Sequence, residues 1–321
     1  MILVTGGCGY IGAHTVSKLI EQNEKVVIID NLTTGFEELL VPNAELIKGD
    51  ISDSELLNNI FSQYDIKGVI HFAASSLVGE SNKKVSEYFE NNVVKTKRLL
   101  DCMIENNVKN IVFSSTAAVY GLPKSNEIDE SHDTNPINTY GDTKLSIEKM
   151  IKRYSDAYGL NYIIFRYFNA CGCDYEKHLG ELHNPETHII PLILDSIKQN
   201  KKFKVFGDDY STEDGSCIRD YIDVRDLAEV HYKGMQILLN NKKFNKILNL
   251  GNNCGFSNFE VIKICEEVTG KKLDYQIDAR REGDPPILIA NATLAKDILE
   301  WTPKFTLKNS IENAWKFKGG W

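Results

Sequence analysis

The stretch Ile2-Leu-Val-Thr-Gly6-Gly-Cys-Gly9-Tyr-Ile-Gly12 joins a short apolar run to a glycine-rich turn and then to a segment with helical spacing. The apolar run predicts a buried strand over residues 2–5, and the apolar spacing predicts a helix over residues 10–22. Glycines at these points permit a tight turn, close approach of the backbone to a ligand, and close packing of helix on strand. The stretch therefore predicts a strand–turn–helix unit.

The rest of the first half repeats this alternation of short β-branched runs and longer helical patterns. We expect strands buried on both faces at residues 2–5, 25–30, 45–48, 69–73, 111–115 and 162–167. We expect helices at residues 10–22, 85–107 and 140–158, and from a Ser52-x-x-Glu55 capping box to about Tyr64. This order predicts an α/β fold with a doubly wound parallel sheet, whose ligands lie beyond the carboxyl ends of the strands.

After about Asn169 the pattern becomes less regular, with turn-rich stretches at residues 207–215 and 281–286. No internal repeat and no Gly/Ser-rich or Pro-rich linker separates the halves. We therefore expect a first domain at residues 1–169 and a smaller mixed α/β domain at residues 170–321, with an approximate boundary across which segments can interleave.

Composition and charge narrow the class of protein. Of the 321 residues, 42% are hydrophobic and 26% are charged, which is ordinary for a globular protein and disfavours disorder. The net charge of -8 argues against a surface built for nucleic acid or an anionic membrane. Met1 leads directly into an apolar strand pattern without a signal-like segment, so we expect a cytoplasmic location.

The cysteines and histidines form no recognised metal-binding pattern. The seven cysteines are scattered without the paired spacing of a zinc site, so we expect reduced thiols, and Cys171-Gly-Cys173 is taken as a coincidence. The seven histidines form no HExxH or similar motif. We therefore expect no metal.

The glycine-rich turn is a candidate phosphate site, because a helix N-terminus supplies backbone donors to an anion. Gly6, Gly9 and Gly12 give GxxGxxG spacing, and Asp30 ends the next expected strand. A carboxylate there can accept both ribose hydroxyls and repel a 2′-phosphate, which favours NAD over NADP, or it can cap the following turn. Asp50 has two similar interpretations: it can meet the adenine amino group or end its strand with a hydrogen-bonded turn.

Tyr140 and Lys144 form the candidate catalytic pair. They are four residues apart at the start of an expected helix, so the ammonium can approach the phenol. A free phenol loses its proton only near pH ~10, and a nearby cation favours the phenolate. Tyr140 is therefore a candidate base. The alternative is a packed tyrosine beside a solvated lysine, and the surrounding motifs favour the base.

With these motifs the chain resembles the UDP-hexose 4-epimerases of the extended short-chain dehydrogenase/reductase family. The resemblance covers nearly the whole length and rests on Thr5–Gly12, Asp30-Asn-Leu, His71-Phe-Ala-Ala74 through Val78-Gly-Glu-Ser81, Asn91-Asn-Val93, Ser114–Gly121, Arg166-Tyr-Phe-Asn169, Thr212–Gly215 through Arg219-Asp-Tyr-Ile222, and Arg280-Arg-Glu-Gly-Asp284. It implies a Rossmann-like NAD-binding domain at residues 1–169 and a UDP-sugar-binding domain at residues 170–321.

The resemblance also implies individual contacts. Cofactor contacts are implied at Tyr10, Ile11, Asp30, Asn31, Asp50, Ile51, Phe72, Ala73, Ala74, Asn91, Ser114, Tyr140, Lys144 and Phe168, in addition to the glycines of the turn. Substrate contacts are implied at Thr116, Tyr140, Asn169, Phe206, Arg219, Arg281, Asp284 and Leu288, with Thr116, Tyr140 and Lys144 catalytic.

Several of these residues also have ordinary structural interpretations. Arg219 and Arg281 can clamp a diphosphate or form surface ion pairs. Phe206 can lie beside uracil or pack in a core, and Asn169 can serve a phosphate or a turn. In the same way, Asp284 can accept from a ribose hydroxyl, and Leu288 can limit room near the sugar's C2 substituent or be a core leucine.

Two positions depart from the family pattern. Ser76 stands where relatives carry a lysine, so one cationic contact to the cofactor is absent and weaker NAD retention is expected. Thr116 stands where many relatives have serine, but its hydroxyl can still pass a proton. Its alternative role is strand packing.

The residues after Thr116 favour one reaction. Ala117 and Ala118 replace the acid and base that related dehydratases use, and alanines cannot carry protons. The resemblance therefore implies interconversion of UDP-galactose and UDP-glucose through a 4-keto intermediate with bound NAD, in a homodimer. The alternatives are a UDP-N-acetylglucosamine or dual-specificity epimerase, a net NAD-dependent oxidoreductase, and a nucleotide sensor without catalysis.

Overall fold

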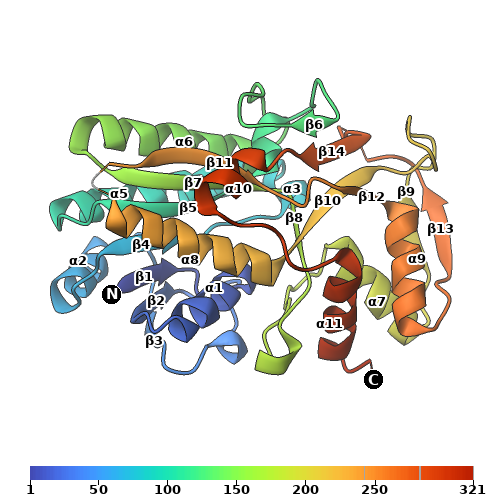
Figure 1. Cartoon of the computed structure of the whole chain (residues 1–321), viewed down its shortest axis with the longest axis horizontal. Helices are drawn as coiled ribbons and strands as arrows, with labels where there is room; N and C mark the ends of the chain where they lie inside the picture. The colour runs from blue at the N-terminus through green and yellow to red at the C-terminus, as the bar shows by residue number, and fades with distance from the viewer. Residues whose placement is uncertain (242, 282, 321) are drawn as a thin grey trace. The chain divides into compact units, whose positions relative to one another are not determined.

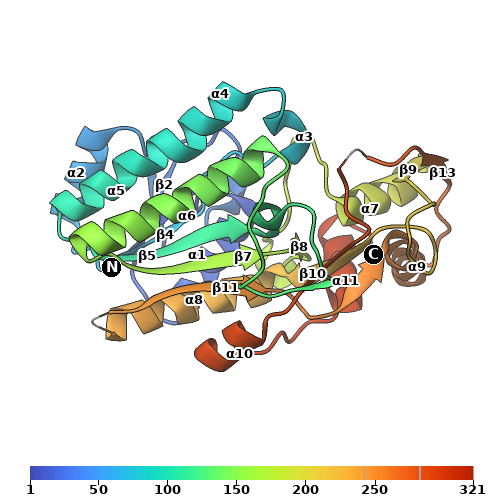
Figure 2. The same ribbon diagram turned by 90° about the horizontal axis from the view of Figure 1, so that it is seen from above.

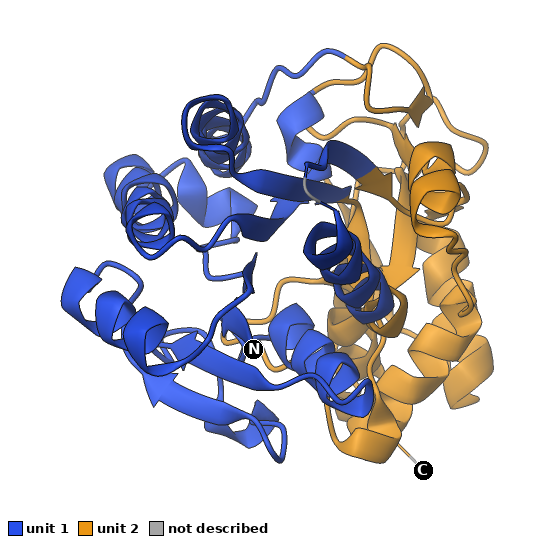
Figure 3. Ribbon diagram, turned by 60° about the vertical axis from the view of Figure 1, so that its left-hand side comes forward, with its two compact units in different colours: residues 1–121, 133–166, 227–248 blue, residues 122–132, 167–226, 249–321 orange. Residues whose placement is uncertain are grey.

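The computed structural model describes residues 1–241, 243–281 and 283–320 (Figure 1). Its contacts divide the chain into two compact units, which Figure 3 colours separately. Unit 1 comprises residues 1–121, 133–166 and 227–248, and unit 2 comprises residues 122–132, 167–226 and 249–321. The expected binding roles of residues 1–169 and 170–321 stay predictions, because this division does not say what each unit binds.

The central element is a seven-stranded sheet in the order β11-β7-β5-β4-β1-β2-β3. Its strands are β1 (Ile2–Thr5), β2 (Val26–Asp30), β3 (Glu45–Lys48), β4 (Gly68–His71), β5 (Asn110–Thr116), β7 (Asn161–Tyr167) and β11 (Asn245–Leu250). The pairs from β3 through β2, β1 and β4 to β5 are parallel. Strand order reverses beside β1, the arrangement that creates a ligand crevice at the carboxyl ends of the strands. The predicted Rossmann-like, doubly wound α/β sheet is confirmed.

Helices cover both faces of this sheet. They are α1 (Tyr10–Glu21), α2 (Ser54–Gln63), α5 (Lys95–Glu105), α6 (Thr139–Tyr158) and α8 (Val224–Asn240). Apolar side chains of α2, α5 and α6 share one core with Leu3, Ile111 and Phe113, while α8 packs on the other face, where Gly234 meets Phe165 and Ile163. Figures 1 and 2 show α5 and α6 lying side by side on one face, with α1 and α8 on the other.

The structure corrects three local expectations. The strand β3 is not buried on both faces, because it is the edge of the sheet and its side chains are half-buried or exposed. The N-cap of α2 is Asp53, whose carboxylate accepts from the Leu56 N–H at 3.0 Å, and the expected Ser52 capping box does not form. The helix expected over residues 85–107 is α4 (Val85–Tyr88), the π-helix η2 (Phe89–Val94) and then α5.

Unit 2 has its own sheets and core. Its five-stranded sheet runs β12-β10-β14-β6, with β8 also paired to β10, and a two-stranded sheet pairs β13 with β9. These strands are β6 (Glu127–Ile128), β8 (Asn169–Cys171), β9 (Phe203–Phe206), β10 (Ile218–Asp223), β12 (Gly255–Ser257), β13 (Tyr275–Asp278) and β14 (Ile287–Ala290). The strand β10 is antiparallel to β12 and parallel to β14 and β8, so this sheet is mixed.

Three helices of unit 2 pack around one apolar core: α7 (Ile189–Gln199), α9 (Asn258–Thr269) and α11 (Leu307–Phe317). The remaining short helices are η1 (Glu37–Leu39), α3 (Val78–Ser81), η3 (Ala117–Tyr120), η4 (Tyr175–Lys177) and α10 (Thr293–Leu299). Across the described part of the chain, none of the helices has both the length and the apolar character needed to span a membrane.

Candidate active site

The expected cofactor residues of unit 1 lie mainly at one edge of the seven-stranded sheet, at the carboxyl ends of its parallel strands. They are Gly6, Gly9, Tyr10, Ile11 and Gly12 after β1, Asp30 and Asn31 at the end of β2, Asp50 and Ile51 after β3, Phe72, Ala73 and Ala74 after β4, and Ser114 in β5. Asn91 lies in η2, while Tyr140 and Lys144 lie in α6. Phe168 lies in unit 2 and is buried.

The glycine-rich turn has the geometry that a phosphate-binding turn requires. Gly6 has φ +72°, and a Cβ there would meet the Ala73 nitrogen at 2.7 Å. A Cβ on Gly12 would meet the Gly6 carbonyl oxygen at 2.1 Å, so both positions exclude larger residues. The helix α1 begins after Gly9 without a side-chain cap, which suits an external anion at its N-terminus. The turn therefore fits a dinucleotide pyrophosphate.

The Asp30 carboxylate shows the structural role expected for it, and its role toward a ribose stays a prediction. Its carboxylate is buried and accepts hydrogen bonds from the backbone N–H groups of Cys8 at 3.0 Å and Leu32 at 2.9 Å. The second bond caps the turn after β2, as the structural interpretation expects. Each carboxylate oxygen has a further lone pair, so the same group can also accept ribose hydroxyls.

Asp50 is joined to Asn31 and to a lysine that the sequence analysis did not single out. Its carboxylate accepts from the Asn31 amide at 2.8 Å, from Lys95 at 2.7 Å and from the Ser52 N–H at 2.9 Å. Burial by itself raises the pKa of Asp50, but these hydrogen bonds outweigh it and lower the pKa to about 2. Asp50 is therefore ionised, and one of its bonds forms the expected turn.

The side chain of Ile51 does not face a polar ligand. It is buried in the apolar core that α2, α5 and α6 share with the sheet. The cofactor contact expected at Ile51 stays a prediction, and only the backbone of this residue is free of the apolar core.

The start of α6 is held firmly, and this fixes the backbone of Tyr140. The Asn82 side-chain oxygen accepts from the Thr139 N–H at 2.9 Å, and the buried Ser81 hydroxyl accepts from the Tyr140 N–H at 3.1 Å. Asn138 caps the helix by accepting from the Gly141 N–H at 2.8 Å. Side chains thus receive three of the N–H groups that a helix N-terminus leaves without an intrahelical partner.

Lys144 lies where the sequence places it, one turn after Tyr140. Its ammonium is buried, donates to the Ser114 carbonyl at 2.8 Å and is 5.8 Å from the centroid of the Tyr140 ring. Burial lowers the pKa of Lys144 to about 7, although the negative charge of Glu148 opposes that shift. The structure therefore holds Lys144 beside the phenol of Tyr140. Because the pKa of Lys144 is near neutrality, nearby charged groups affect whether the lysine is protonated.

Thr116 ends β5 and stands at the N-cap of η3. Its hydroxyl oxygen accepts from the Ala118 N–H at 3.1 Å. The side chain is half-buried, so it is not simply packed inside the sheet. Ala117 and Ala118 are the first two residues of η3, and neither side chain can carry a proton.

Sequence reasoning missed a buried ion pair that joins α6 to β7. Arg166 donates to Glu148 through two nitrogens, at 2.9 and 2.6 Å, and the Ser115 hydroxyl donates to the same carboxylate at 2.6 Å. The Arg166 guanidinium also lies 4.9 Å from the centroid of the Tyr120 ring. Arg166 stood inside a quoted motif, but its partner lies in another element and only the fold brings them together.

A second missed group surrounds Asn91 in the π-helix η2. Asn91 donates to the Ser75 hydroxyl at 3.0 Å. The neighbouring Asn92 is fully buried, accepts from the Ser75 N–H at 2.8 Å and donates to the Thr143 hydroxyl at 3.0 Å. Asn92 therefore links the segment after β4 to α6. Single π-turns are frequent at functional sites, and this turn places both asparagines.

Four of the expected substrate residues of unit 2 form two pairs, one an ion pair and the other a cation–π contact. Arg219 forms an ion pair with Asp284 and donates to the Ile218 carbonyl at 2.7 Å. The Arg281 guanidinium lies 4.3 Å from the centroid of the Phe206 ring. Phe206 is half-buried and Arg281 is exposed, so neither is a core residue.

Two further expected substrate residues lie on β8 and β14, which both pair with β10. Asn169 donates to the Asp220 carbonyl at 3.0 Å. Leu288 is directly opposite Arg219 in the β10–β14 pair and is half-buried. Directly opposed residues of neighbouring strands place their side chains on the same face of a sheet. Leu288 therefore lies on the face that carries the Arg219 guanidinium.

Comparison with known proteins shows the family to which this chain belongs. The family model described as "NAD dependent epimerase/dehydratase family" matches residues 2–251. The chain belongs to this NAD-dependent family. The UDP-glucose 4-epimerase of Halalkalibacterium halodurans is 51% identical over 318 residues, which cover 98% of this chain and 95% of that protein.

Solved structures of such epimerases share the fold over nearly the whole chain. A crystal structure of a UDP-glucose 4-epimerase has a TM-score of 0.96 and 46% identity, covering 99% of this chain and 97% of the other. The Bifidobacterium longum UDP-glucose 4-epimerase, solved in complex with NAD+ and UDP, has a TM-score of 0.93 and 34% identity, covering 99% and 98%. The family relationship therefore extends beyond the matched residues 2–251.

Proposed function

We propose that this protein is a UDP-glucose 4-epimerase that interconverts UDP-galactose and UDP-glucose through a 4-keto intermediate, using bound NAD. The observation that carries this proposal is the Tyr140–Lys144 pair, fixed at the start of α6 beside the carboxyl end of β5. The identity of 51% to a curated epimerase over almost the whole chain supports the same reaction.

The residues of unit 1 fit NAD. The turn from Gly6 to Gly12 suits the pyrophosphate, and Asp30 suits a ribose with two free hydroxyls, because a carboxylate repels a 2′-phosphate. When bound, NAD+ supplies the hydride acceptor and later returns the hydride. In this proposal Lys144 contacts the nicotinamide ribose and Asp50 or Asn31 lies near the adenine.

Tyr140 acts as the base in the oxidation step. Its phenolate takes the proton of the sugar's 4-hydroxyl, directly or through the Thr116 hydroxyl, and returns it in the reverse step. The Lys144 ammonium stabilises the phenolate while it carries a charge. Because Ala117 and Ala118 cannot carry protons, neither can promote loss of water from the keto intermediate.

Residues of unit 2 hold the nucleotide diphosphate in this proposal. Arg219 and Arg281 contact the phosphates, Phe206 lies beside uracil, and Asp284 accepts from the ribose. The Arg219 guanidinium has more N–H donors than its bonds to Asp284 and Ile218 use, so it can keep those bonds and still meet a phosphate. A firmly held diphosphate then lets the hexose turn and present its opposite face for the return of hydride.

We further propose that the protein acts as a cytoplasmic homodimer. All seven cysteines are free thiols, which suits a reducing compartment. The helical segments at residues 85–105 and 139–158 supply the surfaces for pairing two copies, as four-helix contacts require.

Conversion of UDP-galactose by the purified protein, with no NAD added, tests the function. The proposal expects UDP-glucose to accumulate to an equilibrium mixture and NAD to be recovered from the denatured protein. Strict dependence on a stoichiometric supply of NAD+, with NADH formed in proportion to product, would instead show a net oxidoreductase.

A further inference from the structure

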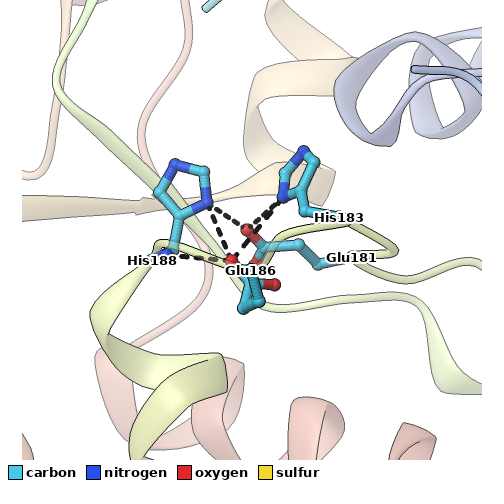
Figure 4. A group of neighbouring side chains, drawn as sticks. All are labelled: Glu181, His183, Glu186 and His188. Atoms are coloured by element: carbon cyan, nitrogen blue, oxygen red, sulfur yellow. Dashed lines mark hydrogen bonds and ion pairs between the residues drawn. The ribbon is translucent and has the colours of Figure 1, made fainter. Parts of the chain in front are cut away.

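Four side chains of unit 2 converge outside all of the residues assigned above. Glu181, His183, Glu186 and His188 lie in the segment directly before α7, and Figure 4 shows them turned toward one another. Each offers one ligand atom, and these four atoms all lie within 4.8 Å of one another. Two imidazoles and two carboxylates in this arrangement are a donor set typical of a metal site.

The distances among these atoms are close to those of a tetrahedral site. Oε1 of Glu181 is 3.0 Å from Nδ1 of His183 and 2.5 Å from Nδ1 of His188. Oε1 of Glu186 is 3.8 Å and 3.4 Å from the same two nitrogens. Ligand atoms bound tetrahedrally to zinc are roughly 3.3 Å apart, given bonds of about 2.0–2.1 Å. Shifts of less than an ångström would therefore suffice to seat one ion.

The surrounding backbone orients this group. The N–H groups of Thr187 and His188 donate to Glu186 at 2.7 and 2.9 Å, which holds its carboxylate toward the cluster. Outer hydrogen bonds of this kind fix metal ligands in place. The Glu181 side chain is only 7% exposed while that of His188 is 51% exposed, so the group has a buried floor and an open side for entry of an ion.

We propose that Glu181, His183, Glu186 and His188 together bind one divalent transition-metal ion, for which Zn²⁺ is the best match. Four protein ligands fill a tetrahedral shell and leave no position for substrate or water, so the ion is structural. It ties the loop from Glu181 to His188 to the start of α7. The sequence analysis expected no metal because this E-x-H-x-x-E-x-H spacing is not the HExxH pattern of a helix. The site does not depend on the proposed epimerase activity.

The same side chains can also pair without a metal, as protonated histidines bound to ionised glutamates. The two possibilities differ in composition, because only one of them contains an ion. They also differ in which histidine atoms carry protons, since ligand nitrogens must be unprotonated.

The test uses the full-length protein, stripped with a chelator and then titrated with Co²⁺ and Zn²⁺. The proposal expects one Co²⁺ per chain with the strong visible absorption of a tetrahedral site, displacement of that absorption by Zn²⁺, and a higher melting temperature with either ion. The variant His183→Gln with Glu186→Gln keeps side-chain size, and should bind roughly 100-fold or more weakly, since even outer-shell changes cost about 10–100-fold. His178→Asn, at an exposed histidine of the same unit, is the matched control and should bind normally.

Two results would overturn the proposal. One is the absence of saturable Co²⁺ or Zn²⁺ binding by the wild-type protein. The other is equal affinity in the double variant and the His178→Asn control. If circular dichroism shows that the double variant does not fold, His188→Gln replaces it, because that side chain is half exposed and its loss disturbs packing little. Equal affinity of His188→Gln and His178→Asn for Co²⁺ or Zn²⁺ would then overturn the proposal.

Discussion

Replacing Glu148 by glutamine tests what its buried ion pair with Arg166 contributes to the packing of α6 on β7. The two side chains are 1% and 4% exposed and are joined by two hydrogen bonds. Glutamine keeps the size and part of the hydrogen bonding but removes the negative charge. Arg166 then stays buried with a charge that no carboxylate balances.

The expected loss follows from that burial. Removing one partner of a buried ion pair costs about 3–5 kcal/mol, because the remaining charge is desolvated without compensation. The same change acts on Lys144, since Glu148 is a negative charge that holds the lysine's pKa up. We therefore expect Glu148→Gln to lower the free energy of unfolding by about 3–5 kcal/mol and to shift the pKa of Lys144 below about 7.

Urea denaturation measures the loss of stability, and it is done at one fixed protein concentration because the stability of the proposed dimer would depend on concentration. Asp156→Asn is the control on the same helix. It removes an exposed pair with Arg153, with an N–O distance of 3.5 Å, and should change stability by less than about 1 kcal/mol. Replacing Glu148 and Arg166 together by methionine should recover much of the loss. A loss below about 1 kcal/mol in Glu148→Gln would refute the reasoning from burial.

Three further predictions concern charge, sugar scope and assembly. Lys144 has a pKa of about 7 in the folded chain and an ordinary pKa of 10.5 in the unfolded chain. Between these pH values only the unfolded chain holds the proton, so the free energy of unfolding of the wild type should rise with pH relative to that of Lys144→Met. Parallel curves of stability against pH for the two proteins would contradict this. Leu288 should permit slower epimerisation of N-acetylated UDP-sugars, and Leu288→Tyr should remove that activity while sparing UDP-galactose. If the ratio of kcat/KM for the N-acetylated sugar to that for UDP-galactose is the same in both proteins, this side chain does not face the sugar. Light scattering should report a homodimer, and a monomer at micromolar concentration would exclude the proposed pairing.

The elements set by local patterns were predictable from the sequence. The strand β1, the glycine-rich turn and α1 follow from adjacent residues, so their bounds agree with the structure to within a residue. The exposure of β3 was not predictable from its own residues. Its apolar residues resemble those of the inner strands, and only the order of strands in the sheet makes β3 an edge.

Two other differences arise from local features that the apolar pattern does not encode. Ser52 and Asp53 are both good N-cap residues, and the choice of Asp53 depends on where the turn after Asp50 ends. The π-helix η2 continues directly from α4 and into α5, so no turn residue in the sequence marks the change in hydrogen bonding. Its effect is visible only in the contacts of Asn91 and Asn92.

The candidate site was predictable where one motif holds its residues, and incomplete where distant elements meet. Tyr140 and Lys144 are separated by one helical turn, so their proximity follows from sequence alone. Glu148 and Arg166 meet because α6 packs on the sheet, which no spacing rule encodes. The cluster from Glu181 to His188 is local, but its convergence depends on a loop conformation rather than on a helical period.

The most direct test of the central claim follows a deuterium atom placed at C4 of UDP-galactose. Transient oxidation with return of the same hydride predicts that the UDP-glucose product keeps the deuterium at C4, with no NADH released. Tyr140→Phe should slow this conversion by ~10²–10⁴-fold while leaving the fold and bound NAD unchanged. Loss of the deuterium to solvent, or near-normal turnover in Tyr140→Phe, would contradict the mechanism.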